Sequence, residues 1–516
     1  MSEPSSSIPM LDRYTSMQDL TANVSRVLKQ SVPWLVAVMG GETAYLFVSD
    51  NPGALAFGMI STGAVIAFAV WAGSARGLPL LPMIVVQSLA VYALPIVSKH
   101  QDVTRYPADY VTQAGLQVLV LCVALVASWR MAMQIFTPAP PLAYALQGVD
   151  REGVAGLSRL GFGLVVAATL FLVLQSLDLT GFIFEVLPGG SYPIVRAGIA
   201  ASSACGFFLL ALIVGAGDLP VAPRTFFWLL MIANCLISAS GFLLSAAALV
   251  LASVVIGLFW SSGRVPWVFI LTVAFTVSFF NMGKYEMRGR YWESPDEELA
   301  RPSGLTGLPT IYLEWTQASW DALTGSESTP TGFNQRDQSR KKPQGLLERL
   351  NNLQNVLYVI DAVEAGHIPT LNGKTYTVIP ALLVPRILWR SKPRTHEGQV
   401  LLNVHFGRQD LQSTFKTYVA WGLPAEAYGN FGPIKGVVFL GVVMGLFFAW
   451  AENFTARKPI LSTEGFVSFV VFLGLANSFE MVASVLVTSI FQSIVPVVAA
   501  CAPFVRRKMV VRPETE

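Results

Sequence analysis

Twelve apolar segments, most of them long enough to cross a bilayer, are the feature that most constrains how this chain can fold. A transmembrane helix needs about 20 apolar residues to span ~30 Å of hydrocarbon. The approximate limits of the segments are 32–49, 54–73, 78–97, 111–129, 160–177, 194–216, 226–241, 244–262, 265–282, 434–452, 464–479 and 482–504. The sequence therefore predicts an all-α polytopic integral membrane protein with about 12 transmembrane helices.

The composition supports the same class. Of the 516 residues 53% are apolar and only 13% are charged, whereas a soluble globular protein carries about 25% charged residues. The net charge of +3 is too small to indicate a nucleic-acid partner. The cysteines lie in apolar segments without metal-ligand spacing, so we expect them to pack rather than bind; they are Cys122, Cys205, Cys235 and Cys501.

Lysine and arginine in the short loops predict the orientation, because these residues are enriched on the cytoplasmic side. With both termini in the cytoplasm, the positive residues expected inside are Arg76, Arg130, Arg151, Arg159, Arg224, Arg264, Arg457 and Lys458, with Arg506, Arg507, Lys508 and Arg512 in the C-terminal tail. The short loops expected outside hold only Lys99, Arg105 and Arg196. Residues 283–433 are thereby expected outside, which is the periplasm in a Gram-negative bacterium.

These limits divide the chain into five parts. They are a cytoplasmic N-terminal tail (1–31), nine transmembrane helices (32–282), a large periplasmic loop (283–433), three transmembrane helices (434–504) and a basic cytoplasmic tail (505–516). The N-terminal tail is expected to be flexible; the alternative is an amphipathic helix over 11–29, on the membrane surface. The splits at 241–244 and 479–482 have no strong turn residues.

Two segments of the large loop have patterns of their own. Apolar residues recur at three- and four-residue steps from 346 to 363, which predicts an amphipathic helix. The apolar segment 378–389 is too short to cross a bilayer and is interrupted by Pro380 and Pro385. It predicts a re-entrant or interfacial segment.

A cationic group follows that segment and is the first candidate site. Its members are Arg386, Arg390, Lys392, Arg394 and His396. Guanidinium groups bind phosphate or pyrophosphate through two oxygens at once, and an arginine beside an apolar segment needs such a partner. The alternative is a solvated basic edge that binds lipid headgroups. Because prolines stiffen the backbone on both sides, we favour the anion site.

A second cationic group, Lys284, Arg288 and Arg290, follows the ninth apolar segment. We expect it to face the first group from the other end of the loop. The equally weighted alternative is anchoring at the membrane interface by these residues with Tyr291 and Trp292.

The segment 424–432, PAEAYGNFG, is the third candidate. Glu426 is its single acid, and it suits either a general base that activates a sugar hydroxyl or a structural counter-ion of Arg386. Tyr428 and Asn430 suit hydrogen bonds to sugar hydroxyls or capping of the helix. His396 lies inside the cationic group, which favours the neutral ring that can act as a base. No sequence pattern for a metal site is present, so we expect no metal and no cofactor.

The string LVPRILWRSKP, followed about forty residues later by AEAYGNFG and a long apolar helix, resembles the bacterial oligosaccharide repeat-unit polymerases of the O-antigen (Wzy) type. The matching residues are Pro385, Arg386, Trp389, Lys392 and Pro393, then Glu426, Tyr428, Asn430, Phe431 and Gly432. Arg390 stands where the family usually has proline, and Ala425 stands where it commonly has glycine. The segment around Lys284 and Arg288 is also similar to a basic stretch of the family.

The resemblance implies a metal-independent glycosyltransferase of the bacterial inner membrane. Its substrate would be an undecaprenyl-pyrophosphate-linked oligosaccharide, and its further partners membrane lipids, a chain-length regulator (co-polymerase) and a flippase. The expected catalytic residues are Arg386, Lys392 and Arg394 for the leaving pyrophosphate, and His396 or Glu426 for the acceptor proton. The expected substrate-binding residues are Lys284, Arg288, Arg290, Trp389, Tyr428 and Asn430.

Three other functions stay open at this point. A ligase that moves glycan from the lipid carrier to another acceptor shares the architecture. A lipid-linked sugar flippase or other transporter is disfavoured, because the chain has no internal repeat and only one large outside loop. A non-catalytic scaffold remains if the basic positions tolerate neutral substitution.

The predicted orientation is testable with reporter fusions. Alkaline phosphatase fused after Pro343 should be active, since it folds only outside the cytoplasm, and green fluorescent protein fused after Glu516 should fluoresce inside the cell. An inactive phosphatase at 343, produced at the same level, would place the large loop in the cytoplasm and contradict the orientation.

Overall fold

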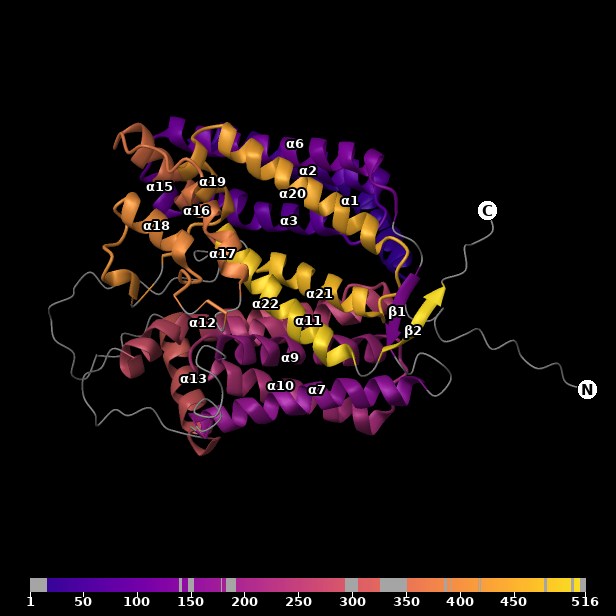
Figure 1. Ribbon diagram of the computed structural model, residues 1–516. Helices are drawn as coiled ribbons and strands as arrows, with labels where there is room; N and C mark the ends of the chain where they lie inside the picture. The colour runs from indigo at the N-terminus through magenta and orange to yellow at the C-terminus, as the bar shows by residue number, and fades with distance from the viewer. Residues whose placement is uncertain are drawn as a thin grey trace, which may run out of the picture. The chain divides into compact units, whose positions relative to one another are not determined.

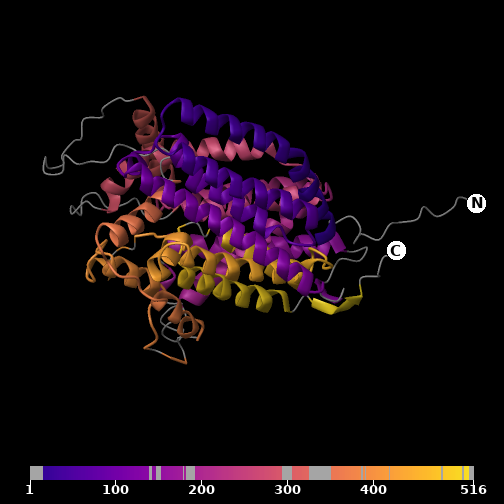
Figure 2. The ribbon, with the colours of Figure 1, turned by 90° about the horizontal axis from the view of Figure 1, so that it is seen from above.

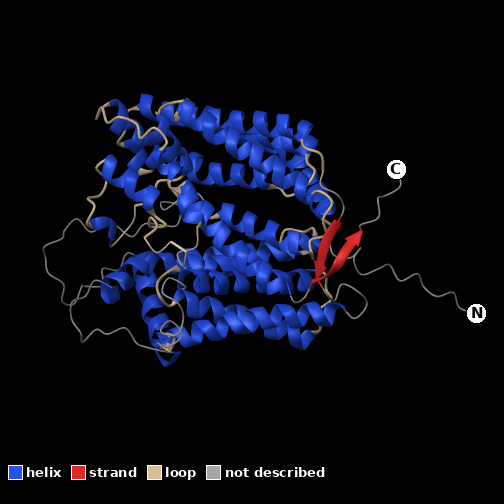
Figure 3. Cartoon of the chain, viewed as in Figure 1, coloured by secondary structure: helices blue, strands red, loops and turns tan. Residues whose placement is uncertain are grey.

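The computed structural model describes residues 16–138, 142–146, 153–177, 179–181, 192–292, 305–324, 350–384, 388–389, 391–415, 417, 419–477, 480–502 and 505–510. The chain divides into two compact units, and each is described here by itself. Unit 1 comprises Met1–Asp150 and Leu350–Glu516, and unit 2 comprises Arg151–Arg349. Helices dominate both units (Figure 3).

Unit 1 contains the N-terminal and C-terminal helices of the chain (Figure 1). Its elements before residue 150 are α1 (Met17–Val48), α2 (Ala54–Ser74), α3 (Leu80–Ser88), a π-helical turn η2 (Leu89–Ala93), α4 (Leu94–Val97), α5 (Gln101–Thr104), α6 (Ala108–Ile135) and β1 (Leu142–Leu146). Those after residue 350 are α15 (Leu353–Glu364), α16 (Lys374–Thr377), α17 (Ile379–Leu383), α18 (Glu397–His405), η5 (Ser413–Phe415), α19 (Leu423–Phe431), α20 (Lys435–Thr455), α21 (Thr463–Ala476), α22 (Ala483–Cys501) and β2 (Val505–Val510).

Unit 2 contains α7 (Gly153–Ser176), α9 (Tyr192–Gly215), α10 (Val221–Ala239), α11 (Leu244–Ser262), α12 (Trp267–Trp292), η4 (Leu305–Gly307) and α13 (Leu308–Thr324). The turn expected at 241–244 is present between α10 and α11. Phe242 lies there with a φ of 58° and is fully buried.

The polytopic helical class is confirmed. Among the described residues, ten helices are long and apolar enough to cross a membrane. The expected segments 464–479 and 482–504 correspond to α21 and α22, whose apolar parts are shorter than the other ten. The third expected segment, 78–97, is assembled from α3, η2 and α4. Twelve crossings therefore stay a prediction.

Two helix limits differ from the expected ones. α1 begins at Met17, so residues 17–31 are helical rather than a flexible tail. The cause is a capping box, in which Ser16 and Asp19 bond each other's backbone N–H groups, together with burial of Met17 and Leu20. α12 continues to Trp292, so the second cationic group lies on a helix instead of in the large loop.

Close backbone contact joins α20 to α6. A methyl group at Gly445 would lie 2.5 Å from the carbonyl oxygen of Leu125 and still closer to the hydroxyl of Ser128. Ser128 in turn donates a hydrogen bond across the interface to the carbonyl of Gly441, at 3.2 Å. Small residues allow this approach, which membrane helices use in place of hydrophobic burial.

A buried carboxylate fixes the C-terminal end of α20, which is the end farther from α19. Glu452 is 1% exposed. Its Oε1 accepts the backbone N–H of Arg76 at 2.9 Å, and its Oε2 accepts the indole N–H groups of Trp129 (2.8 Å) and Trp71 (3.3 Å). Because its oxygens already accept hydrogen bonds from fixed donors, we infer that Glu452 has a structural role: it holds α20, α6 and the turn after α2 together.

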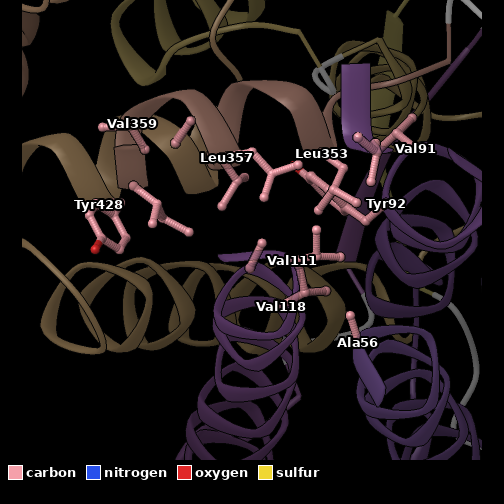
Figure 4. Packing of buried hydrophobic residues seen from close by; sticks show 14 of the residues in the cluster. Ala56, Val91, Tyr92, Val111, Val118, Leu353, Leu357, Val359 and Tyr428 are labelled. Atoms are coloured by element: carbon pink, nitrogen blue, oxygen red, sulfur yellow. The ribbon is translucent and has the colours of Figure 1, made fainter. Parts of the chain in front are cut away.

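The helix expected over 346–363 is present as α15; residues 346–349 lie outside the described residues. Its apolar face packs against α6 and α19, with Leu353, Leu357 and Tyr428 in one cluster (Figure 4). Figures 1 and 2 place α15 to α19 at one end of the long helices of unit 1 and the strands at the other.

The strand pair was not expected from the sequence. β1 pairs with β2 in antiparallel orientation, with Leu142 opposite Val510. The first half of the predicted basic tail is therefore a strand, because its partner is distant in sequence and supplies the backbone hydrogen bonds.

The α6–α20 contact predicts a difference between two glycines. Gly445→Ala should lower the thermal unfolding midpoint in detergent, because the clash of about 1–3 kcal/mol exceeds the gain in helix propensity of about 1 kcal/mol. Gly40→Ala is the matched control, since Gly40 lies within α1 with no atom within 4 Å of the added methyl, and its midpoint should not fall. Equal midpoints for the two variants would contradict the packing.

Candidate active site

The PAEAYGNFG segment forms α19, and every residue from Leu423 to Asn430 is buried. Pro424 lies in the first turn, where its missing N–H group costs no hydrogen bond, and the helix ends at Gly432, whose φ is 76°. Gly436 lets the start of α20 lie against the carbonyl of Ala427. The segment is therefore a packed helix rather than an open loop.

The turn before α16 is bonded to α19 through the backbone. The N–H of Leu371 donates to the carbonyl of Gly429 at 2.9 Å, and the N–H of Asn372 donates to that of Asn430 at 2.8 Å. Asn372 and Gly373 both have left-handed φ values, 50° and 84°, which asparagine and glycine tolerate best. This Asn-Gly turn is what brings Thr375 to Glu426.

Glu426 is fully buried, and both of its carboxyl oxygens are bonded. Oε1 accepts the hydroxyl of Thr375 at 2.6 Å, and Oε2 accepts the N–H of Ala483 at 2.6 Å. Burial raises the pKa of Glu426 from its usual 4.5 to about 7, although the bonds from Thr375 and Ala483 act in the opposite direction. The proton of this carboxyl group is thus exchangeable near neutral pH.

Asn430 completes this buried group. Its amide donates to the hydroxyl of Thr375 at 2.8 Å and to the carbonyl of Glu426 at 2.8 Å. Tyr376 stacks on Phe431, and its buried hydroxyl has no hydrogen-bond partner among the described residues. Burial, followed by the negative charge of Glu426, raises the pKa of Tyr376 well above its usual range.

The first turn of α22 is the point where these segments meet. Val482 provides no side-chain cap for this helix, so Glu426 supplies from another helix an acceptor for its first N–H group, that of Ala483. α18 approaches the same turn, because a methyl group at Gly398 would lie 2.5 Å from the hydroxyl of Ser484. Glu426 and the start of α18 therefore both contact the first turn of α22.

Lys392 is buried, with 9% of its surface exposed. Its ammonium group donates to the carbonyls of Leu382 at 2.9 Å and Val384 at 2.7 Å, at the C-terminal end of α17. α17 packs in turn against α22. Lys392 therefore caps a short helix and fixes the segment that follows the predicted re-entrant stretch.

Arg394 has one nitrogen available for an anion. Its Nε lies 3.4 Å from the carboxylate of Glu397, and its guanidinium covers the ring of Phe415 at 4.5 Å. Its Nη1 is buried without a hydrogen-bond partner among the described residues. An unpaired guanidinium nitrogen in that position is costly unless a ligand fills it.

His396 and Tyr428 are both held by nearby groups. The Nδ1 of His396 lies 2.9 Å from the side-chain oxygen of Gln399, within the first turn of α18. The hydroxyl of Tyr428 donates to Glu364 at 3.1 Å and accepts from Gln113 at 3.1 Å. Burial, followed by the neighbouring carboxylate of Glu364, raises the pKa of Tyr428. Tyr428 thus links α19 to α15 and α6.

Three predicted positions have no described contact with this group. Arg386 and Arg390 lie outside the described residues. The expected ion pair between Arg386 and Glu426 therefore stays a prediction. Trp389 is described, and its exposed ring donates only to the adjacent Ser391, at 3.1 Å.

The second cationic group belongs to unit 2, where it holds helices together. Arg288 donates through two nitrogens to the carbonyl of Phe242, at 2.8 and 3.2 Å. Arg290 pairs with Glu286 at 3.1 Å and with Glu314 of α13 at 3.2 Å. Lys284 is buried. These contacts favour a structural role for the group, and its expected position opposite 386–396 stays a prediction.

Sequence reasoning missed Thr375, Tyr376 and the first turn of α22 as partners of Glu426. The polar Thr375 between an Asn-Gly turn and an apolar segment was the available signal for the first contact. The bond to Ala483 comes from a backbone N–H group, which no residue type marks.

The raised pKa of Glu426 predicts a pH-dependent stability. Between pH 4.5 and 7 the folded state holds a proton that the unfolded state releases, so the stabilisation is complete below pH 4.5 and is lost as the pH rises to about 7. The free energy of unfolding should fall by about 3 kcal/mol, since the pKa of Glu426 rises from 4.5 to about 7 and each unit corresponds to about 1.4 kcal/mol. Thermal midpoints of the purified protein should fall from pH 5 to pH 8, and Glu426→Gln should flatten that fall.

Glu397→Gln is the control for this experiment, because Glu397 is a partly exposed acid of the same region. It should keep the pH dependence of the unsubstituted protein. If Glu426→Gln kept the same dependence as Glu397→Gln, the assignment of the proton to Glu426 would be wrong.

Comparison with known proteins gives no further assignment. No family model, no curated protein and no solved structure matches the chain. The resemblance noted for residues 385–393 and 426–432 is therefore supported by those residues alone.

Proposed function

We propose that this protein is a membrane glycosyltransferase that polymerises undecaprenyl-pyrophosphate-linked oligosaccharide repeat units into a surface polysaccharide, such as O-antigen, capsule or exopolysaccharide. The reaction takes place at the periplasmic face of the bacterial inner membrane. The proposal rests on the resemblance of two segments, 385–393 and 426–432, to repeat-unit polymerases.

One observation supports this reading most directly: both segments are connected to α22. Glu426 of the second segment bonds Ala483. Lys392 of the first segment bonds the end of α17, which packs against α22. Two segments that are distant in sequence and contact the same helix can contribute to one site.

The reaction replaces a glycosyl phosphate bond with a glycosidic bond. An acceptor sugar hydroxyl forms a bond to the anomeric carbon of the growing glycan, and the bond from that carbon to the pyrophosphate breaks. The hydroxyl proton passes to a base, and the pyrophosphate leaves on its lipid. Fixed cations lower the barrier by stabilising the charge that develops on the departing oxygen.

Arg394 is the described cation best suited to that role. Its Nη1, which has no hydrogen-bond partner in the described part of the chain, offers a donor, while Glu397 and Phe415 hold the guanidinium in place. Lys392 acts as a positioning residue, because its ammonium group already bonds two carbonyls. Arg386 completes the anion site in this proposal, as the resemblance implies.

His396 fits the base role better than Glu426. The ring of His396 is partly exposed, whereas Glu426 is 0% exposed and both of its oxygens accept hydrogen bonds. A general base must come within hydrogen-bond reach of the hydroxyl that it deprotonates. Glu426 is accordingly a positioning residue that fixes α16, α19 and α22 together.

The proposal includes a membrane topology. The ten long helices together with α21 and α22 make twelve crossings, both termini are cytoplasmic, and the residues between the end of α12 at Trp292 and the start of α20 at Lys435 form the periplasmic loop. Two polyprenyl tails then enter the site from the surrounding lipid.

The role of Arg394 gives the decisive test. Arg394→Gln should reduce chain elongation by about 10²-fold, which is the usual cost of removing one donor to a developing negative charge. The assay uses purified protein in lipid with lipid-linked repeat units, and it measures product length on gels. Glu397→Gln removes the ion pair but keeps the guanidinium, so it should retain most of the activity.

Lys374→Gln is the control for lost positive charge, because Lys374 is exposed on α16; its activity should stay within about twofold. Equal losses in Arg394→Gln and Glu397→Gln would assign Arg394 a structural role. Transfer of the glycan to a second acceptor without elongation would identify a ligase. Unchanged polymer with repeat units accumulating on the cytoplasmic side would favour a transporter.

A further inference from the structure

A polar, positively charged pocket of about 430 Å³ lies in unit 1 at the end of α20 that is opposite to α19. Its lining includes hydroxyl and cationic side chains from α1, from the end of α2 and from the turn after α20. The residues on which the argument rests are Thr21, Ser25, Lys29, Ser74, Arg76 and Arg457. None of them belongs to the proposed active site.

The cations around this pocket have no acidic partner among the described residues. Among the residues that the structure describes, no carboxylate lies within 4.0 Å of the charged nitrogens of Lys29, Arg76 or Arg457. Arg130 adds a fourth positive charge at the rim, since it donates to the hydroxyl of Ser74 at 2.6 Å. The nearest buried acid, Glu452, is bonded to backbone and indole N–H groups instead.

Helix dipoles do not account for all of these charges. The C-terminal ends of helices attract cations, and Arg76 donates to the carbonyl of Met133 at 2.9 Å, near the end of α6. Lys29 has no such explanation, because α1 continues to Val48. On α1 the residues Thr21, Ser25 and Lys29 follow one another at four-residue steps, so a polar stripe of this lipid-exposed helix faces the pocket.

We propose that this pocket binds the phosphate group of an anionic phospholipid. Phosphate oxygens accept hydrogen bonds from lysine, arginine and hydroxyl groups together, and a net negative headgroup balances the unpaired cations. The pocket lies where helices that are long enough to cross the membrane end, so a lipid headgroup reaches it while its acyl chains stay beside α1. This inference is independent of the proposed glycosyltransferase activity.

Native mass spectrometry of the full-length protein tests the proposal. Phosphatidylglycerol and phosphatidylcholine are added separately to the detergent-solubilised protein, and the fraction of lipid-bound protein is measured. Phosphatidylglycerol should bind more tightly, and Lys29→Gln with Arg457→Gln should weaken it by about tenfold. Inorganic phosphate, added as a competitor, distinguishes a lipid from a free phosphate ligand.

Arg26→Gln with Lys435→Gln is the matched control, because it also removes two exposed positive charges and neither residue lines the pocket. It should change binding less than twofold. Equal weakening in the two double variants, equal binding of both lipids, or tight binding of inorganic phosphate alone would each overturn the proposal. If the pocket double variant is not monodisperse, the single variants Arg457→Gln and Lys435→Gln are compared instead. Arg457→Gln should then weaken phosphatidylglycerol binding more than Lys435→Gln does, by less than the tenfold expected of the double variant.

Discussion

The bond between the buried carboxylate of Glu426 and the first turn of α22 is the contact on which the rest of unit 1 near the candidate site depends. Glu426 accepts from Thr375 on one side and from Ala483 on the other, so it joins three segments that are distant in sequence. A fully buried acid is costly, and its cost is reduced here by placing it at a helix end with free N–H groups. The geometry around it is consequently rigid and sensitive to its protonation.

The cations of the same region differ in whether their nitrogens already have hydrogen-bond acceptors. Lys392 already donates to the carbonyls at the end of α17, whereas Nη1 of Arg394 is buried without an acceptor among the described residues. The same contrast separates the two ends of unit 1. Near α19 the charge of Glu426 is embedded in hydrogen bonds, and at the far end of α20 Lys29 and Arg457 line an open pocket without acidic partners in the described part of the chain.

The fold class and most helix positions could be predicted from the sequence, because apolar length is sufficient to identify a membrane helix. The start of α1 at Met17 could not, since its capping box lies in a polar segment that resembles a tail. The extension of α12 through Lys284, Arg288 and Arg290 was missed because charged residues ended the apolar pattern while the helix continued. β1 and β2 could not be anticipated, because each depends on a partner strand at the other end of the chain.

The candidate site was predictable in part. The residue types of 424–432 pointed to the right segment, and Glu426 and Asn430 do lie together. The capping role of Lys392 was not foreseeable, because its acceptors are backbone carbonyls whose positions follow from the tertiary fold.

The glycine-mediated contact between α6 and α20 has one more consequence. With backbone atoms this close at Gly441 and Gly445, the seam between the two helices has no width for a hydrocarbon chain. Lipid in the plane of the bilayer is therefore excluded along this side of unit 1, and the isoprenoid tail of the proposed substrate would have to enter between other helices.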